Sequence, residues 1–313
     1  MTRQLSISIV SWNTRDLLKQ CLESVFAHLD GVDTEVIVVD NASEDSSPDM
    51  VEREFPQVVL IRQTSNGGFA QANNVALAES SGKYFLLLNS DTIVHPGSIK
   101  RLVDFMESIP EAGAAAPKLL NLDGSLQRSC SIFPSPATEL YDAVYLSKLL
   151  PRSKLFGGYA MSYWDFDQER DVDFAGGSCL MLRRSALDQV GALDEGYFMY
   201  TEEADLCYRL KQAGWRVVFL PDAQIVHIGG QSTKRCASRM AVQLPISRHR
   251  FIRKFQGSGP AALFKGAVAL GSALRLLAWS PSWFTANGYR KDLEQRLRTQ
   301  SALVKWAIFG GGR

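Results

Sequence analysis

The chain has 313 residues, of which 46% are hydrophobic and 21% are charged, and this ordinary composition excludes disordered, collagen-like and coiled-coil proteins. The net charge is +1, yet residues 241–313 contain 12 Lys and Arg against 2 Asp and Glu, whereas residues 1–240 contain 22 against 31. An acidic body therefore carries a strongly basic tail. The five cysteines are scattered and form no CxxC pair, which predicts neither a zinc site nor a disulfide framework and indicates a reducing cytosol.

The first half of the chain alternates short apolar runs with helical patterns. Strands are predicted at residues 5–10, 35–39, 58–61 and 84–88. Helices are predicted between them, capped at residue 13 or 14, starting near 43, spanning 69–80 and running from 96 to about 110. Because these strands are apolar throughout and alternate with helices, we expect an α/β fold with a mostly parallel sheet and helices on both faces.

The second half of the chain begins irregularly. Residues 121–170 contain many turn signals and predict loops and short helices over one end of the sheet. Ordered patterns return as a strand-like run at 172–182, helices at 185–190 and 204–213, and a strand at 215–220. We therefore expect one α/β domain over residues 1–240 and a basic, apolar-rich helical extension over residues 241–313.

Polar residues follow each of the four strands of the first half. They are Ser11, Trp12 and Asn13, then Asp40 and Asn41, then Asn66, Gly67 and Gly68, and finally Asn89, Ser90 and Asp91. In open α/β sheets ligands bind beyond the carboxyl ends of the strands, so we expect a binding site here. The loop preference of Asn and Asp explains any one of these positions, but it explains all four together poorly.

Asn89 and Asp91 lie two residues apart after the fourth strand and therefore on the same side of the chain. Oxygen ligands at that spacing suit Mg²⁺ or Mn²⁺, which also bind the phosphate oxygens of a substrate. The alternative is an Asx-turn before Pro96. No GxGxxG, GxxxxGKS/T or GxSxG pattern occurs, which disfavours nicotinamide- or flavin-dependent dehydrogenases, P-loop NTPases and serine hydrolases.

Two further groups of titratable residues are candidates for chemistry. Glu202, Glu203 and Asp205 open a predicted helix, where they either complement the helix dipole or supply a general base. His227 ends a strand-like run before a Gly-Gly pair. A lone histidine is more often structural, but an imidazole beside an aspartate is able to complete a metal site.

These residues belong to seven ordered motifs over about residues 5–232, and together the motifs resemble the inverting family 2 glycosyltransferases of the GT-A fold. The resemblance is strongest to the branch that includes bacterial rhamnosyltransferases and galactofuranosyltransferases. The motifs read IVSWNTRDLLKQCLESV, EVIVVDNASEDSS, NGGFAQANNVAL, FLLLNSDTIV, FAGGSCLMLRRSAL, GALDEGYFMYTEEADLCYRLKQAGWRV and PDAQIVHIGGQS. Each motif alone is weak, but seven in the same order are specific.

The resemblance implies how a nucleoside-diphosphate sugar donor would bind. Asp40 would accept a hydrogen bond from the imide NH of the base, and Gly176 and Gly177 would lie against the donor sugar and the acceptor. The implied donor-binding residues are Ser11, Trp12, Asn13, Asp40, Asn41, Asn66, Gly68, Phe69, Asn73, Asn89, Ser90, Gly176 and Gly177. Users of UDP-sugars and dTDP-sugars share these pocket residues, and the branch favours dTDP-rhamnose.

The resemblance also implies a metal-dependent, inverting mechanism. Asp91, at the DxD position of the family, and His227 would hold Mg²⁺ or Mn²⁺, while Asn89 stands where the first carboxylate usually is. The carboxylates of the base motif are Glu202, Glu203 and Asp205. Glu203 takes the position of the usual catalytic Asp and would deprotonate the acceptor hydroxyl in a single displacement. The alternative is a non-catalytic nucleotide-sugar or glycan-binding protein on the same fold.

The basic tail has two interpretations. It either packs on the catalytic domain or pairs protomers, or it binds the anionic inner leaflet of a membrane. We favour a cytoplasmic enzyme, peripheral on the membrane, that binds no nucleic acid and glycosylates a glycan or lipid-linked glycan for cell-wall or surface-polysaccharide assembly. The N-terminus reads as a first strand and not as a signal peptide, and no run of 18 uncharged apolar residues predicts a membrane span.

Overall fold

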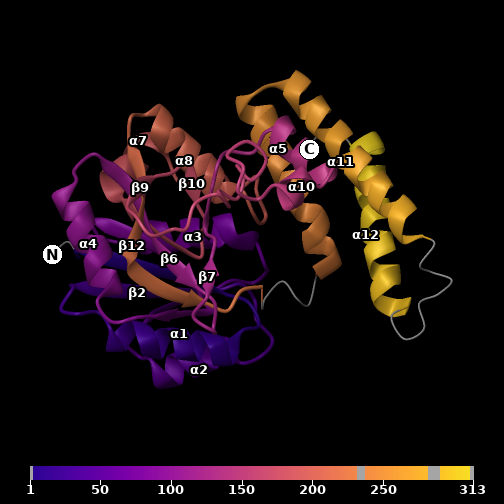
Figure 1. Cartoon of the computed structure of the whole chain (residues 1–313). Coiled ribbons are helices and arrows are strands. Elements are labelled where there is room, and N and C mark those ends of the chain that lie inside the picture. Colours follow the sequence, from indigo (N-terminus) through magenta and orange to yellow (C-terminus); the bar gives the residue numbers. More distant parts are fainter. Residues whose placement is uncertain (1–2, 231–236, 281–289, 311–313) are drawn as a thin grey trace. The chain divides into compact units, whose positions relative to one another are not determined.

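The computed structural model describes residues 3–230, 237–280 and 290–310 (Figure 1). The chain divides into two compact units, which we call the sheet unit (residues 1–131, 165–198 and 202–234) and the helical unit (residues 132–164, 199–201 and 235–313). The sheet unit has 17 Lys and Arg against 29 Asp and Glu, whereas the helical unit has 17 against 4. The segment 132–164, within the region that sequence predicts to be irregular, therefore belongs with the basic C-terminal helices.

The sheet unit is built on a ten-stranded sheet whose main path has the order β3-β2-β1-β4-β11-β6-β12-β5. These strands are β1 (Leu5–Ser11), β2 (Thr34–Asp40), β3 (Val59–Arg62), β4 (Tyr84–Asn89), β5 (Thr92–Val94), β6 (Ala112–Leu120), β11 (Cys179–Arg183) and β12 (Arg216–His227). β1 to β4 run parallel to one another, as predicted, and β6 is parallel to β12. β11 and β5 are antiparallel to the strands they pair with.

Short strands extend this arrangement. β7 (Leu126–Gln127) pairs with β6, and β9 (Arg170–Asp171) pairs with β12. β8 (Cys130–Ser131) and β10 (Phe174–Ala175) form a separate two-stranded sheet.

Helices cover both faces of the sheet (Figure 1). They are α1 (Arg15–Ala27), α2 (Ser47–Glu54), α3 (Gly68–Glu79), α4 (Ser98–Ser108), α7 (Arg184–Val190) and α8 (Glu202–Gln212). Alternate residues of β1, from Leu5 to Ile9, point to one face and form a core with apolar residues of α1, α2 and α4. Ser8 points to the other face, where its hydroxyl donates to Asn73 of α3 at 2.7 Å.

Two elements differ from the prediction because tertiary contacts override local preference. β6 was not expected, since its Ala-rich sequence favours a helix, but small buried residues suit the middle of the sheet between β11 and β12. α2 begins at Ser47 and not near residue 43. Ser43 Oγ accepts a hydrogen bond from the backbone N–H of Asn13. The Asp45 carboxylate accepts from the N–H groups of Arg15 and Ser47, the first residues of α1 and α2, so α2 begins only after Asp45.

Two strands differ in extent from the prediction. The run at 172–182 is split at Gly176 and Gly177 into β10 and β11. β12 continues seven residues beyond the predicted end at residue 220, through a register shift between Leu220 and Gln224, and so reaches His227. The last two residues of the closing motif, 231 and 232, lie outside the described residues.

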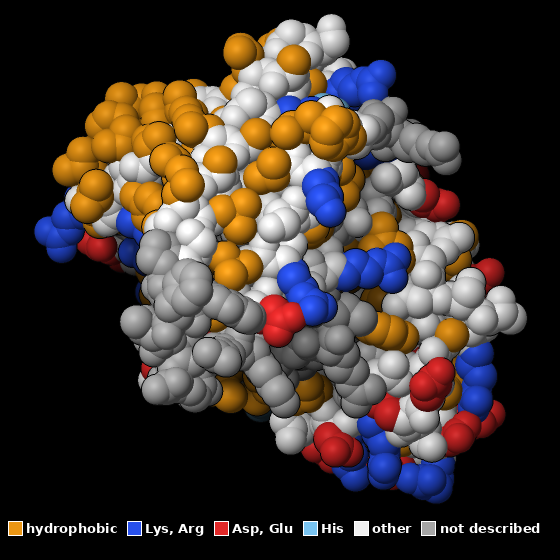
Figure 2. All heavy atoms as spheres, turned by 90° about the vertical axis from the view of Figure 1, so that its right-hand side faces the viewer, with side chains coloured by type: hydrophobic (Ala, Val, Ile, Leu, Met, Phe, Trp, Pro, Cys, Tyr) orange, Lys and Arg blue, Asp and Glu red, His pale blue; other side chains and the backbone are white. Residues whose placement is uncertain are grey.

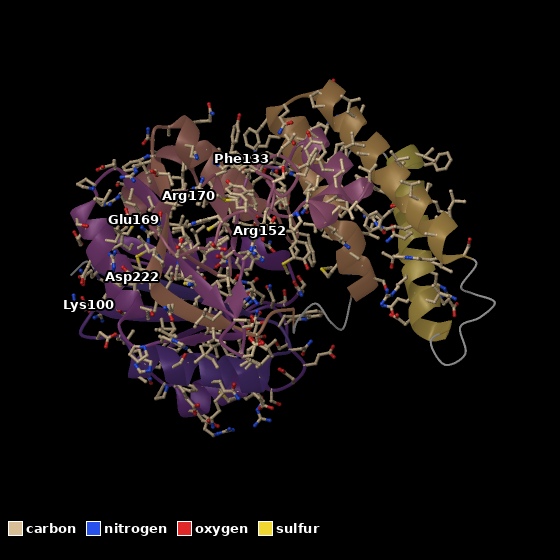
Figure 3. The ribbon with its side chains drawn as sticks, viewed as in Figure 1. Lys100, Phe133, Arg152, Glu169, Arg170 and Asp222 are labelled. Atoms are coloured by element: carbon tan, nitrogen blue, oxygen red, sulfur yellow. The ribbon has the colours of Figure 1, made fainter. Side chains whose placement is uncertain are left out.

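The helical unit contains α5 (Pro136–Ala143), α6 (Leu146–Leu149), α10 (Ala237–Phe255), α11 (Ser258–Trp279) and α12 (Arg290–Phe309). α11 packs against α5, α10 and α12. Gly271 permits the close approach to α5, because an added Cβ would lie 2.9 Å from Cβ of Ala143. Phe133, labelled in Figure 3, stacks on Phe251 with ring centroids 5.7 Å apart.

α11 is, in the described part of the chain, the one helix that is long and apolar enough to cross a membrane by length and composition. Its most apolar window has a mean hydropathy of 1.5, and a third of that window is buried within the protein. The sequence analysis predicted no membrane span because it required 18 residues without a charge, and this helix contains Lys265 and Arg275.

Candidate active site

The carboxyl ends of β1, β2, β4 and β12 meet at one edge of the sheet. The parallel register places Ser11 beside Asp40, and β4 is parallel to β1. His227, at the end of β12, pairs with Thr92, which directly follows Asp91. Polar residues from four separate parts of the sequence therefore converge, as expected for the ligand edge of such a sheet.

The loop after β2 holds a carboxylate oxygen that lacks a hydrogen bond. Asp40 is 3% exposed; its Oδ2 accepts from the Ser43 N–H at 2.9 Å, whereas its Oδ1 is buried and has no partner among the described residues. Asn13, with φ of 54°, fixes this loop because its Oδ1 accepts from the Glu44 N–H at 2.7 Å. A buried acceptor without a donor is costly, so Asp40 Oδ1 is a candidate to receive an N–H group from a ligand.

A chain of hydroxyl groups joins the ends of β1 and β4. Ser11 Oγ lies 3.2 Å from Thr14 Oγ1, and Thr14 Oγ1 lies 2.9 Å from Ser90 Oγ. All three side chains are buried, whereas Trp12 is half-buried. Ser11 and Ser90 therefore hold the two strand ends together, and Trp12 keeps part of its surface exposed beside them.

The loop that begins α3 depends on a glycine. Gly68 has φ of +89°, and an added Cβ would lie 2.2 Å from the carbonyl oxygen of Phe198. Its N–H donates to Asn66 Oδ1 at 3.0 Å, and its carbonyl accepts from Asn41 Nδ2 at 3.2 Å. Asn66 and Asn41 thus set the path of this loop.

Asn73 and the Gly-Gly pair support the same loop. Asn73 is 1% exposed, and both polar atoms of its amide bind within the protein, since Nδ2 donates to the Phe69 carbonyl at 2.9 Å and Oδ1 accepts from Ser8. An added Cβ at Gly177 would lie 3.0 Å from the Phe69 ring, so this glycine permits close packing. Gly176 is bound through its N–H to the Ser129 carbonyl at 2.8 Å.

Asn89, Asp91 and His227 form a cluster at the end of β4. His227 Nε2 lies 3.3 Å from both Asp91 Oδ1 and Asn89 Nδ2. On its other side, His227 Nδ1 lies 2.6 Å from Gln127 Oε1. Gln127 is itself held, because its Nε2 donates to the His227 carbonyl at 3.0 Å and to Asn121 Oδ1 at 2.9 Å.

This cluster fits a divalent cation. In the tautomer that donates from Nδ1 to Gln127 Oε1, the lone pair of Nε2 accepts from Asn89 Nδ2 or binds a cation beside the Asp91 carboxylate. A cation bound by both His227 Nε2 and Asp91 Oδ1, which lie 3.3 Å apart, would stabilise this contact. In the described ranges no group of three or more His, Cys, Asp and Glu forms a metal site. Substrate phosphates and water would complete the ligand set, as is usual for Mg²⁺.

The three carboxylates at the start of α8 have different surroundings. Asp205 is fully buried and accepts from Arg209 Nε at 2.7 Å and from the Tyr197 hydroxyl at 3.2 Å. Arg209 also donates to the three carbonyls of residues 190–192, so this pair anchors the helix to the preceding loop. Glu202 is 3% exposed, whereas Glu203 is only half-buried.

Glu203 faces the same side of α8 as Cys207, one turn later, whose thiol is hydrogen-bonded to the backbone of Ala175 in β10. Glu203 therefore lies on the side of the helix that faces the Gly-Gly segment. The two residues before α8, Tyr200 and Thr201, have φ of 68° and 73°. Such values are rare for residues other than glycine, and rarest for β-branched ones, and they cluster at functional sites.

The cysteines do not supply a nucleophile in the described part of the chain. Burial raises the pKa of Cys21, Cys130 and Cys207 to about 12 and also raises the pKa of Cys179. All four are therefore neutral thiols at physiological pH. The fifth, Cys236, lies outside the described residues.

Sequence reasoning overlooked two residues of this site. Thr14 was considered only as a helix cap, and Gln127 lies in a segment without any motif. Both act through partners far away in sequence, Ser90 and His227, so no local pattern marks them.

Comparison with known proteins identifies the architecture. The sequence model of glycosyl transferase family 2 matches residues 6–191. An N-acetylglucosaminyl-diphospho-decaprenol L-rhamnosyltransferase of Mycobacterium tuberculosis is 36% identical over 211 residues, which cover 64% of this chain and 68% of the relative. The rhamnosyltransferase WbbL of Escherichia coli is 27% identical over 234 residues, which cover 71% and 82%.

Solved structures show the same fold. The mannosyltransferase PcManGT from Pyrobaculum calidifontis, in complex with GDP-Man and Mn²⁺, aligns with a TM-score of 0.59 and 17% identity over 98% of this chain and 88% of its own. GalNAc-T7 with UDP, GalNAc and Mn²⁺ aligns with a TM-score of 0.59 and 14% identity over 98% and 56%. The predicted GT-A fold is thereby confirmed.

Proposed function

The chain belongs to glycosyl transferase family 2 and is a glycosyltransferase, and we propose that it transfers rhamnose from a dTDP- or UDP-linked donor to a hydroxyl of a lipid-linked glycan in cell-wall or surface-polysaccharide assembly. The names of the mycobacterial and Escherichia coli relatives support the sugar, and the mycobacterial name supports a lipid-linked acceptor. No observation favours the alternative of a non-catalytic binding protein.

The observation that carries this proposal is the cluster of Asp91, His227 and Asn89 at the edge of the sheet. An imidazole lone pair and a carboxylate that face each other at 3.3 Å suit a divalent cation that also binds a diphosphate. Asp91 and His227 would hold Mg²⁺ or Mn²⁺, with Asn89 beside them. When bound, the cation would stabilise the negative charge of the departing nucleoside diphosphate.

Asp40 and the surrounding loops would select the nucleotide. Its buried Oδ1 would accept a hydrogen bond from the imide N–H of uracil or thymine. Trp12, half-buried at the end of β1, would contact the nucleotide. Because the loops on both sides are fixed by Asn13 and Gly68, this edge is preorganised for the donor.

Glu203 would act as the general base. Its carboxylate would accept the proton of the acceptor hydroxyl while that oxygen attacks the anomeric carbon and the bond to the diphosphate oxygen breaks. One displacement without a covalent intermediate inverts the anomeric configuration. Asp205 would hold α8 in place through Arg209 and would not exchange protons with substrate.

We also propose that the enzyme acts at the cytoplasmic face of a membrane as a peripheral protein. A nucleotide-sugar donor is a cytoplasmic metabolite class, and a lipid-linked acceptor is confined to the bilayer. The strongly basic helical unit supports attraction to anionic lipids.

Donor binding is tested by thermal unfolding with dTDP, UDP or GDP, each with Mg²⁺, Mn²⁺ or EDTA. A ligand at 100 times its dissociation constant adds about 2.7 kcal/mol, or a shift of about 5–11 °C for a domain of this size. We expect stabilisation by dTDP or UDP that requires metal and disappears in Asp91→Asn. The exposed Asp104→Asn is the matched control. A shift with GDP alone, or one unaffected by EDTA, contradicts the proposed donor site.

A further inference from the structure

Large apolar side chains are exposed mainly on the helical unit. In the described part of the chain 13 large hydrophobic residues are exposed, and 11 of them belong to the helical unit. Figure 2, which views the molecule from the side of α11 and α12, shows a broad area of apolar side chains. Exposed apolar area of this extent on one unit marks an interaction surface.

α11 contributes one continuous stripe to this surface. Its exposed leucines are Leu263, Leu270, Leu274 and Leu277. Their spacing of 7, 4 and 3 residues places them on one face of the helix, while Phe264 and Val268 are buried against the unit. The two charged residues of the helix are half-buried, so none of its fully exposed side chains carries a charge.

The neighbours of α11 extend the stripe at both ends. Arg275 donates to the Asp142 carbonyl at 3.3 Å and lies over the Tyr145 ring, so the second half of α11 runs beside the start of α6. Lys265 donates to the Gly310 carbonyl, so the first half lies beside the end of α12. The last two residues of α12, Ile308 and Phe309, are 61% and 81% exposed.

The segment from residue 148 to 155 combines exposed leucines with exposed cations. Leu149, Leu150 and Leu155 are 72%, 46% and 59% exposed. Lys148, just before Leu149, and Arg152 and Lys154, between Leu150 and Leu155, are also exposed; Figure 3 labels Arg152. Among the described residues neither Arg152 nor Lys154 forms an ion pair, and no Asp or Glu occurs between residues 142 and 165.

We propose that these two elements, the leucine stripe of α11 and the segment 148–155, form a docking surface for an anionic phospholipid bilayer. The leucines would enter the headgroup boundary and the three cations would bind lipid phosphates. The net charge of +13 of the helical unit is complementary to such a surface and opposes a second copy of this unit. The inference deepens the proposed membrane location, and it depends on neither the donor nor the acceptor.

The experiment is sedimentation of the full chain with vesicles of phosphatidylcholine alone or with 30% phosphatidylglycerol. We expect binding to the anionic vesicles that decreases in 0.5 M salt. Each cation near an anionic surface contributes about fivefold, so Lys148→Gln, Arg152→Gln and Lys154→Gln together should weaken binding about 100-fold. The control removes three exposed cations of the sheet unit: Arg53→Gln, Arg62→Gln and Lys100→Gln.

A second variant tests the apolar contribution. Leu149→Ser, Leu150→Ser and Leu155→Ser should remove the part of vesicle binding that persists in 0.5 M salt. Equal sedimentation of the wild type and both variants, or wild-type binding to neither vesicle, overturns the proposal. A leucine variant that changes a dimer into a monomer in light scattering without vesicles also overturns it, because the surface would then bind a second copy. Nucleotide-dependent thermal stabilisation, measured in parallel, reports on the proposed function separately.

Discussion

Replacing Asp205 by Asn removes a buried charge but keeps the size of the side chain, and we expect it to destabilise the sheet unit without abolishing catalysis. The substitution weakens the charge-assisted hydrogen bond from Arg209, whose guanidinium keeps its three backbone acceptors. A hydrogen bond to a charged group contributes about 1.5–3 kcal/mol, which corresponds to a fall in Tm of about 3–12 °C. Asp205→Ala also removes the acceptor of Tyr197 and should cost about 3–5 kcal/mol.

The assay pairs unfolding by differential scanning calorimetry with turnover of the donor sugar at a temperature where each variant is folded. Glu203→Gln is the counterpart, since a half-buried base contributes little to stability; it should keep the wild-type Tm and lose about 10²–10⁴-fold in kcat. Glu202→Gln, measured alongside, tests the remaining carboxylate of the motif. A stable Asp205→Asn enzyme without turnover, or a fully active Glu203→Gln enzyme, would refute this assignment of roles.

Three further substitutions test the loop, the metal cluster and the acid stability. Gly68→Ala introduces a Cβ 2.2 Å from a carbonyl oxygen and should weaken nucleotide binding by more than tenfold in calorimetric titration. Gly31→Ala, at a φ of +80° with nothing within 4 Å, controls for backbone strain alone. Gln127→Leu removes the acceptor of His227 Nδ1 and should weaken Mn²⁺ binding about 10–100-fold, read from the free Mn²⁺ signal in electron paramagnetic resonance; unchanged affinity would contradict the role of Gln127. Burial raises the pKa of Glu35, but hydrogen bonds from two serines outweigh it and the net pKa is lowered. The ionised carboxylate therefore stabilises the folded state above its unfolded pKa, and this contribution is lost as pH falls through the lowered folded value. Glu35→Gln should accordingly lower the urea midpoint at pH 7 more than at acidic pH, and an equal effect at both would contradict the assignment.

The parallel half of the sheet is predictable from sequence because β2 and β4 read as apolar runs that are mostly buried, and helical patterns separate the four strands. β6 is not predictable from sequence, because its alanines favour a helix locally and only its position between β11 and β12 makes it a strand. The start of α2 was displaced for a related reason. Ser43 resembles a helix-capping residue but binds the backbone that follows β1. Asp45 accepts from the first N–H groups of both α1 and α2, so the helix begins two residues after it.

In the candidate site, residues at strand ends could be predicted from sequence, whereas contacts between residues distant in sequence could not. Asp40, Asp91 and His227 could be placed because strand ends meet at one edge once the topology is known. The different surroundings of Glu203 and Asp205 could not be predicted, because Asp205 is paired with Arg209, which also binds the loop at residues 190–192. Asn73 has an amide like that of a ligand-binding residue, and only the structure shows that Ser8 and the Phe69 carbonyl occupy it.

The pairing of β12 with β5 has a consequence for the order in which the enzyme is made. Asn89 and His227 are 138 residues apart in the chain, and closing a loop of that length costs about 4 kcal/mol in chain entropy. The four parallel strands leave the ribosome long before β12 does. A nascent or prematurely ended chain that lacks β12 therefore cannot complete the histidine side of the cluster. In the proposed site, the imidazole that would hold the cation is supplied only when β12 is added, so a chain that ends earlier lacks a complete cation site.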